Sequence, residues 1–229
     1  MSEFLGGSAR NLIEQVLLVF AALFPIVNPV GAAPVFLAMT EGLADAERAQ
    51  LAGRIALNSF LLVLGSIFVG THVIDFFGLS VPTVRVGGGI LVCAVAWDLL
   101  RSPEAGLPEA PPHRPTPLQL AARAFYPMTL PLTVGPGTIS VAITLGAQMP
   151  RSVSEWAVRI VASAVGTVLL TISIYVLFRY AERLTRAIGS TGTQVLLRLS
   201  AFILLCIGVQ IVWSGVLALV ATVPALRAS

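Results

Sequence analysis

The chain has 229 residues, of which 56% are hydrophobic and only 11% are charged. Soluble domains carry about 25% charged residues, so this composition indicates an integral membrane protein and excludes an ordinary soluble globular domain. The formal net charge of +3 comes from arginine, because the sequence contains no lysine. Basic residues beside membrane spans set the orientation of a chain in the bilayer, so this charge gives no reason to expect nucleic acid as a partner.

Six segments of the sequence are predicted to cross the membrane. A helix needs about 20 largely apolar residues to cross a bilayer. We therefore expect an all-α membrane protein in which residues 1–100 and 118–229 each contribute three spans, joined by a proline-rich cytoplasmic linker at 101–117. The predicted spans are 11–39, 53–73, 81–100, 118–149, 156–178 and 195–221.

The first and fourth predicted spans are longer than one crossing needs and are broken by proline and glycine. Residues 24–34 and 126–137 both contain Pro-x-x-x-Pro followed by a Gly/Pro cluster. An unpaired backbone group in lipid is costly, so a break is tolerated only where it is buried in protein or lines a polar cavity. Paired broken helices in the two halves of a chain point to the substrate site of a transporter. The alternative for each segment is a kinked structural helix.

The two halves also correspond outside these breaks. The spacing from Arg85 to Cys93 equals the spacing from Arg198 to Cys206. Because each half has three predicted spans, the second half must insert upside down relative to the first, which gives two inverted three-helix repeats. Most arginines at the span ends fall on the side away from the termini, so that side is predicted to be cytoplasmic and both termini outside. The glycine run at 87–89 predicts close helix packing.

The breaks predict a site built from backbone and small polar side chains. Asn28 and Pro29 have the residue types of an N-cap and a first helical position, and Gly135-Pro136 suggests a second helix start that Thr133 could cap. The free N–H groups of such starts carry about half a positive charge. Neither broken segment contains a charged side chain, so a small, net-neutral solute is expected. The predicted substrate-binding residues are Asn28, Pro29, Gly31, Thr129, Thr133, Gly135, Gly137 and Thr138.

Three further polar residues are candidates for gating or for anchoring the helices. Arg85 and Arg198 each lie about one turn inside a predicted span, where arginine either snorkels to the interface or has a functional partner. Gln210 lies within the last span, where a hydrogen bond between helices and a contact with the substrate are both open. No catalytic or metal-binding constellation is visible, so we expect neither an enzyme, nor a metal site, nor a cofactor.

Four stretches of this sequence also carry a resemblance to a known family. They are residues 25–29, 77–88, 135–139 and 198–210. With them the chain resembles the MarC family of bacterial and archaeal inner-membrane proteins, which includes members described as small neutral amino acid transporters. The resemblance implies a secondary transporter of such amino acids or of similar small metabolites, in the cell inner membrane. Family members often have Ala where this chain has Val134, a difference that could narrow the site.

The sequence alone does not exclude other functions. A narrow channel or a membrane scaffold without transport is the main alternative, and drug efflux is less favoured because no cage of aromatic and acidic residues is visible. The sequence leaves open a coupling ion (H⁺ or Na⁺), the direction of transport and assembly into a homo-oligomer.

Overall fold

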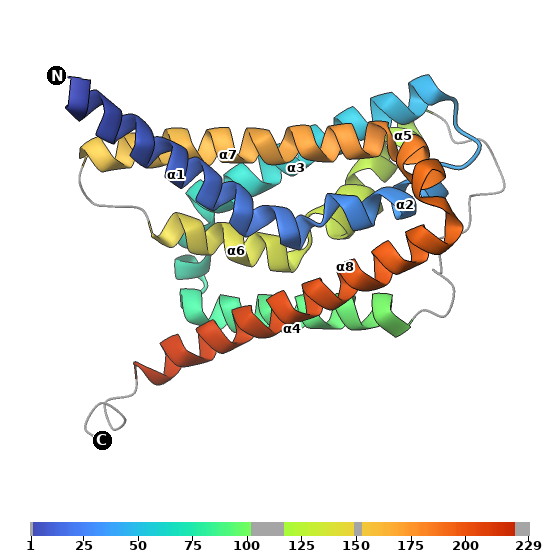
Figure 1. The fold of residues 1–229 in the computed structure, drawn as a ribbon. Coiled ribbons are helices and arrows are strands. Elements are labelled where there is room, and N and C mark those ends of the chain that lie inside the picture. The colour runs from blue at the N-terminus through green and yellow to red at the C-terminus, as the bar shows by residue number, and fades with distance from the viewer. Residues whose placement is uncertain (1, 102–116, 149–152, 223–229) are drawn as a thin grey trace.

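The structure, a computed structural model, describes residues 2–101, 117–148 and 153–222. The described residues are nearly all helical and contain no strand, which confirms the predicted all-α class. Most of the predicted linker at 101–117 lies outside the described residues. The helices are α1 (Ser2–Val27), α2 (Pro29–Met39), α3 (Asp45–Phe76), α4 (Val81–Arg101), α5 (Pro117–Arg123), the π-helix η1 (Ala124–Thr133), α6 (Pro136–Ala147), α7 (Val153–Arg179) and α8 (Ala181–Val220) (Figure 1).

Four of these helices are long and apolar enough to cross a membrane on their own. Two bent pairs also pass this test when each pair is taken together: α1 with α2, bent by 43°, and the α5–η1 segment with α6, bent by 71°. By length and composition, the described chain therefore has four candidate membrane spans, or up to six if each bent pair is one span. The bends lie in the first and fourth predicted spans. The four single helices with the required length and hydropathy are Asp45–Phe76, Val81–Arg101, Trp156–Arg179 and Thr191–Val220.

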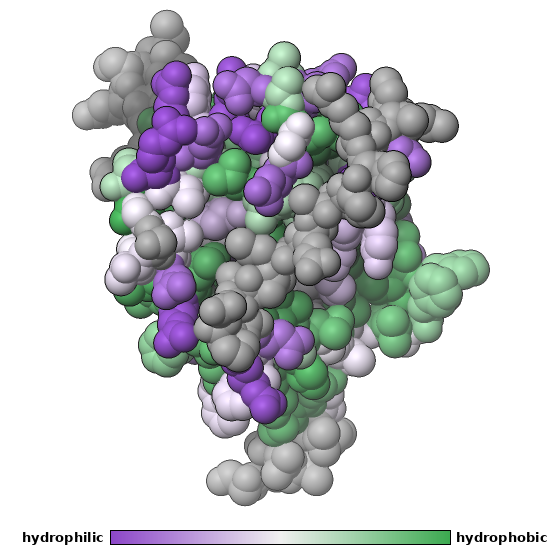
Figure 2. All heavy atoms as spheres, turned by 90° about the vertical axis from the view of Figure 1, so that its right-hand side faces the viewer, coloured by the Kyte–Doolittle hydropathy of each residue, from purple (hydrophilic) through white to green (hydrophobic). Residues whose placement is uncertain are grey.

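The chain passes back and forth between two ends of the molecule, and its N- and C-terminal ends lie at the same end (Figure 1). We call this the termini end. We call the opposite end, where α3 and α8 begin and α4 and α7 finish, the arginine end. There Arg48 forms ion pairs with Asp45 at 3.4 Å and with Glu182 at 2.9 Å, and Arg186 also pairs with Glu182. Hydrophilic side chains gather over part of this end in Figure 2.

The larger buried core joins α1, α2, α3, η1, α6 and α7. Its largest buried side chains include Phe36 of α2 and Phe178 of α7, whose rings stack with centroids 4.6 Å apart. Leu23 of α1 and Ile55 of α3 are fully buried in the same cluster. This packing fixes the first broken pair of helices against α7.

Helices α4 and α8 lie side by side and run in opposite directions (Figure 1). Their contact depends on small residues: a Cβ on Gly89 would come 2.8 Å from the Val212 backbone nitrogen, and one on Gly208 would come 2.6 Å from the Cys93 sulfur. Such distances leave no room for a larger residue. The close packing predicted for the glycine run is thus found at Gly89, and also at Gly88, which meets Ser140 of α6, whereas Gly87 faces open space.

The helices of each half of the chain pack against helices of the other half. Helix α2 of the first half packs against α7 and α8 of the second half, while α6 of the second half packs against α3 and α4 of the first. In the same way α1 contacts α7, and η1 contacts α3. Each broken pair is therefore held largely by helices of the other half.

Helix α8 is itself interrupted near its start. Gly189 has φ 75° and ψ 172°, a backbone conformation that glycine adopts readily and other residues avoid. The break separates the polar first turns from the apolar part Thr191–Val220, which begins four residues before the predicted sixth span at 195–221.

Candidate solute-binding pocket

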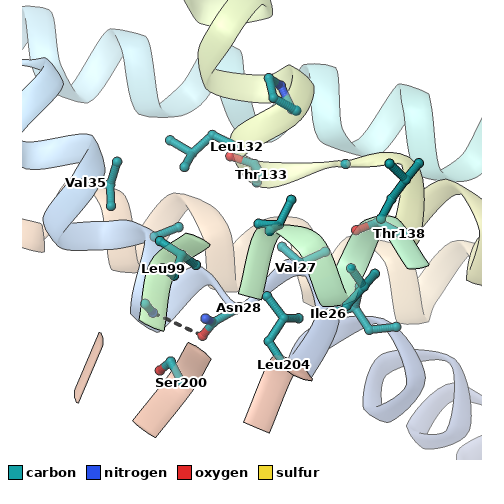
Figure 3. Close-up of a pocket in the computed structure, with 18 of the residues that line it drawn as sticks. Ile26, Val27, Asn28, Val35, Leu99, Leu132, Thr133, Thr138, Ser200 and Leu204 are labelled. Carbon is teal, nitrogen blue, oxygen red and sulfur yellow. Dashed lines mark hydrogen bonds between the residues drawn. The ribbon is translucent and has the colours of Figure 1, made fainter. Parts of the chain in front are cut away.

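A cavity of about 340 Å³ lies where the two helix breaks meet α4 and α8 (Figure 3). Pockets for small molecules usually measure roughly 300–1,000 Å³, so this one is at the small end of the range. Its lining comes from the end of α1, from α2, α4, η1, the start of α6, and α8. Both halves of the chain therefore contribute to it.

The cavity occupies only one half of the molecule's length. On α4 it is lined by residues between Leu91 and Leu99, and on α8 by residues between Leu197 and Leu204. On α6 the lining ends at Thr138, two residues into the helix. Residues 81–90 of α4 and 139–147 of α6 do not line it. The cavity thus extends from the helix breaks toward the arginine end, and its lining does not reach the parts of α4 and α6 near the termini end.

Most of the lining is aliphatic, and the residues that line the cavity in the described chain carry no charge. Four polar side chains interrupt this surface: Asn28, Thr133, Thr138 and Ser200. The first three were predicted from the sequence. Ser200 was not, although Leu197, Ser200 and Leu204 have the spacing of one helical face, which was the signal available.

The first break is centred on Asn28. Its backbone has φ 46° and ψ 55°, the left-handed region that asparagine tolerates better than most residues. Its Oδ1 accepts a hydrogen bond from the Gly31 N–H at 3.2 Å, and its carbonyl accepts one from the Ala32 N–H at 2.9 Å. Asn28 is thus the N-cap of α2 and Pro29 its first residue, as predicted. The start of α2 offers fewer free donors than predicted, because Pro29 has no N–H and the Gly31 N–H is already bonded.

The second break ends at Pro136, where α6 begins as predicted. Gly135 is its N-cap in an extended conformation, with φ −84° and ψ 175°, and no side chain caps this helix start. The predicted cap by Thr133 is wrong, because the Thr133 hydroxyl donates to the Met128 carbonyl at 2.7 Å. The π-helical turn of η1 brings that carbonyl, five residues earlier, within reach of the hydroxyl.

The predicted site residues fall into two groups. Asn28, Gly31, Thr133, Gly135, Gly137 and Thr138 line the cavity. Pro29 and Thr129 are buried outside the lining. The Thr129 hydroxyl donates to the Ala124 carbonyl at 2.6 Å and accepts from the Asn58 amide at 3.5 Å, so it holds η1 together and ties it to α3.

None of the predicted gating or anchoring residues lines the cavity. Arg85 is half-buried, and its Nε donates to the Thr144 hydroxyl of α6 at 3.0 Å. Arg198 and Gln210 are exposed on α8. Among the residues that the structure describes, no three His, Cys, Asp or Glu side chains gather in a metal-binding group.

Comparison with known proteins identifies the family. Residues 13–220 match the model described as MarC family integral membrane protein. The inner membrane protein MarC of Escherichia coli O1:K1 / APEC is 27% identical over 219 residues, which cover 93% of this chain and 98% of that protein. The inner membrane protein MarC of Escherichia coli strain K12 gives the same identity and coverage. No solved structure matches the chain. The chain therefore belongs to the MarC family of integral membrane proteins.

Proposed function

We propose that this protein is a secondary transporter of small neutral amino acids or of similar small metabolites. The observation that carries the proposal is the cavity between the two helix breaks, which both halves of the chain line with backbone, small polar side chains and no charged residue. Binding sites of many secondary transporters lie near the bilayer midplane, at the interface of two repeats and beside broken helices.

The lining suits a small molecule without net charge. A zwitterion needs donors for its carboxylate and acceptors for its ammonium group, and interrupted helices present both kinds of backbone group. The aliphatic surface provided by Leu91, Val95 and Leu99 is available for an apolar side chain. A charged side chain on the solute would be buried there without a partner, which is costly.

We propose six spans arranged as two inverted repeats, with each bent pair forming one broken span. The exchange of packing supports this arrangement, because α2 contacts α7 and α8 where α6 contacts α3 and α4. The excess of arginine at the arginine end favours the cytoplasmic side for that end and an outside location for both termini. The names of the relatives support a place in the cell inner membrane.

Alternating access would follow from the one-sided position of the cavity. Near the termini end, α4 and α6 close the path: the Ser140 hydroxyl donates to the Val84 carbonyl at 2.9 Å, and Arg85 bonds Thr144 at 3.0 Å. Separating α6 from α4 while α2 closes onto α8 would open the cavity to the other side. Coupling to H⁺ or Na⁺ and passive exchange are both compatible with this movement.

The test is counterflow of labelled alanine in proteoliposomes of the purified protein. Saturable exchange that is lost in Asn28→Ala and kept in Gln210→Ala would support a carrier that uses the cavity, because Asn28 lines it and Gln210 is exposed elsewhere on α8. Flux that does not saturate and shows no counterflow would indicate a channel. Absence of flux for a panel of small neutral amino acids would refute the proposed substrate.

A further inference from the structure

The two helix starts that meet at the cavity differ in whether a side chain caps their backbone N–H groups. At the start of α2, the side chain of Asn28 already accepts the Gly31 N–H. At the start of α6, the N-cap is Gly135, which has no side chain, and no other side chain caps the helix. The first two residues of α6 that have an N–H, Gly137 and Thr138, both line the cavity.

The hydroxyl of Thr138, at the start of α6, lacks a hydrogen-bond partner among the described residues. Thr138 is only 2% exposed, and its hydroxyl makes no hydrogen bond within the part of the chain that the structure describes. Figure 3 shows the hydroxyl oxygen turned toward the pocket on the side of Val27. By contrast, the hydroxyl of Thr133, which lines the same cavity, is bonded to the Met128 carbonyl. Hydroxyl groups this deep in a protein nearly always have a partner, and the cavity that Thr138 lines is where a partner for its hydroxyl can be supplied.

The start of α6 is also held in place by close packing. A Cβ on Gly137 would collide with the Val92 side chain of α4, and a Cβ on Gly135 would come within 3.2 Å of the Pro131 carbonyl oxygen. These contacts fix the backbone on both sides of Pro136. A helix start that is rigid before binding does not lose entropy when a ligand arrives, and this favours affinity.

We infer that the start of α6 is the carboxylate subsite of the solute. The Gly137 N–H, the Thr138 N–H and the Thr138 hydroxyl supply three donors on one side of the pocket. A helix N-terminus binds anionic groups without a cationic side chain, which fits a lining that has no charge. The inference rests on the proposed function and narrows it: the solute must have a free carboxylate, and its apolar part lies toward Leu91 and Val95.

The chemistry of the solute gives the first test. Unlabelled L-alanine should inhibit counterflow of labelled alanine, whereas L-alaninamide, which keeps the ammonium group and lacks the carboxylate, should inhibit at least about tenfold less well. Equal inhibition by alanine and alaninamide would overturn the subsite and leave transport itself intact.

A set of threonine variants gives the second test. Thr138→Val keeps the shape and removes the hydroxyl, so the half-saturation concentration of alanine should rise about tenfold to a hundredfold, since hydrogen bonds to charged groups are strong. Thr138→Ser should restore most of this loss. Thr171→Val is the matched control, because the Thr171 hydroxyl bonds the Thr167 carbonyl on α7, outside the cavity lining. If the half-saturation concentration of alanine is the same in Thr138→Val as in this control, the subsite is contradicted.

Thermal stabilisation of the purified protein separates the subsite from transport. Alanine and propionate both have a carboxylate and should raise the unfolding temperature of the wild type more than that of Thr138→Val. Stabilisation without exchange would refute transport and keep the subsite. If neither compound stabilises the wild type and the wild type exchanges no alanine, both the subsite and transport are refuted.

Discussion

Replacing one glycine of the 87–89 run tests the contact that closes the cavity at the termini end. A Cβ on Gly88 would overlap the Ser140 Cβ and come 2.6 Å from its hydroxyl, whereas a Cβ on Gly87 would meet nothing within 4 Å. Both changes to alanine gain about 1 kcal/mol of helix propensity, which cancels in a comparison of the two variants. The overlap at Gly88 should cost about 1–3 kcal/mol, so this is the expected difference in stability.

The assay is thermal unfolding of Gly88→Ala and Gly87→Ala in the same detergent. For a chain of this size each kcal/mol corresponds to about 2–4 °C, so Gly88→Ala should unfold roughly 2–12 °C below Gly87→Ala. Adding Ser140→Gly to Gly88→Ala removes both of the overlapping Ser140 atoms and should recover part of the loss, as a double-mutant cycle would show. Equal unfolding temperatures for the two single variants would refute the close approach of α4 and α6.

Three further predictions concern the core, the first break and the half-buried arginine. Phe36→Ala removes a fully buried ring that stacks on α7 and should lower stability by about 3–5 kcal/mol. Phe202→Ala, at a residue that is 56% exposed, should cost far less in the same denaturation assay. Asn28→Ala removes the cap of α2 and leaves alanine at a positive φ, so the free energy of unfolding should fall by about 1–3 kcal/mol. Asn28→Gly should lower it less, because glycine adopts a positive φ readily. A larger loss in Asn28→Gly than in Asn28→Ala would contradict the left-handed geometry. Arg85→Leu loses its bond to α6 and should slow counterflow more than Arg198→Leu, at an exposed arginine; equal rates would remove Arg85 from the closing contact.

The features that could be predicted from sequence are those with local causes. Asn28 followed by Pro29 identifies a helix start because the cap and the fixed φ of proline act within a few residues. Gly135-Pro136 identified the start of α6 for the same reason. The run of uncharged residues around each break was enough to predict a cavity without charge, and the described lining has that character.

Features that depend on distant parts of the chain could not be predicted. Thr133 has the residue type of a cap, yet the π-helical geometry of η1 gives its hydroxyl a carbonyl partner instead. Arg85 finds its partner 59 residues away, which no periodicity within one helix reveals. Ser200 enters the lining because α8 lies beside α4 and α2. The confinement of the cavity to one half of the molecule arises from the same long-range packing.

The exchange of packing between the halves has a consequence for biosynthesis. Phe36 of α2 is covered by Phe178 of α7, and α2 packs on α7 and α8 while α1 packs on α7, so residues 2–101 alone lack most of the surface that covers their broken pair. If the chain enters the membrane while it is being synthesised, the interrupted helix of the first half lacks these neighbours until the second half follows. Its final packing must wait for α7 and α8, and the cavity cannot form before the last helix is in place. Assembly of the native protein is thus a late event, completed only when the C-terminal helix docks.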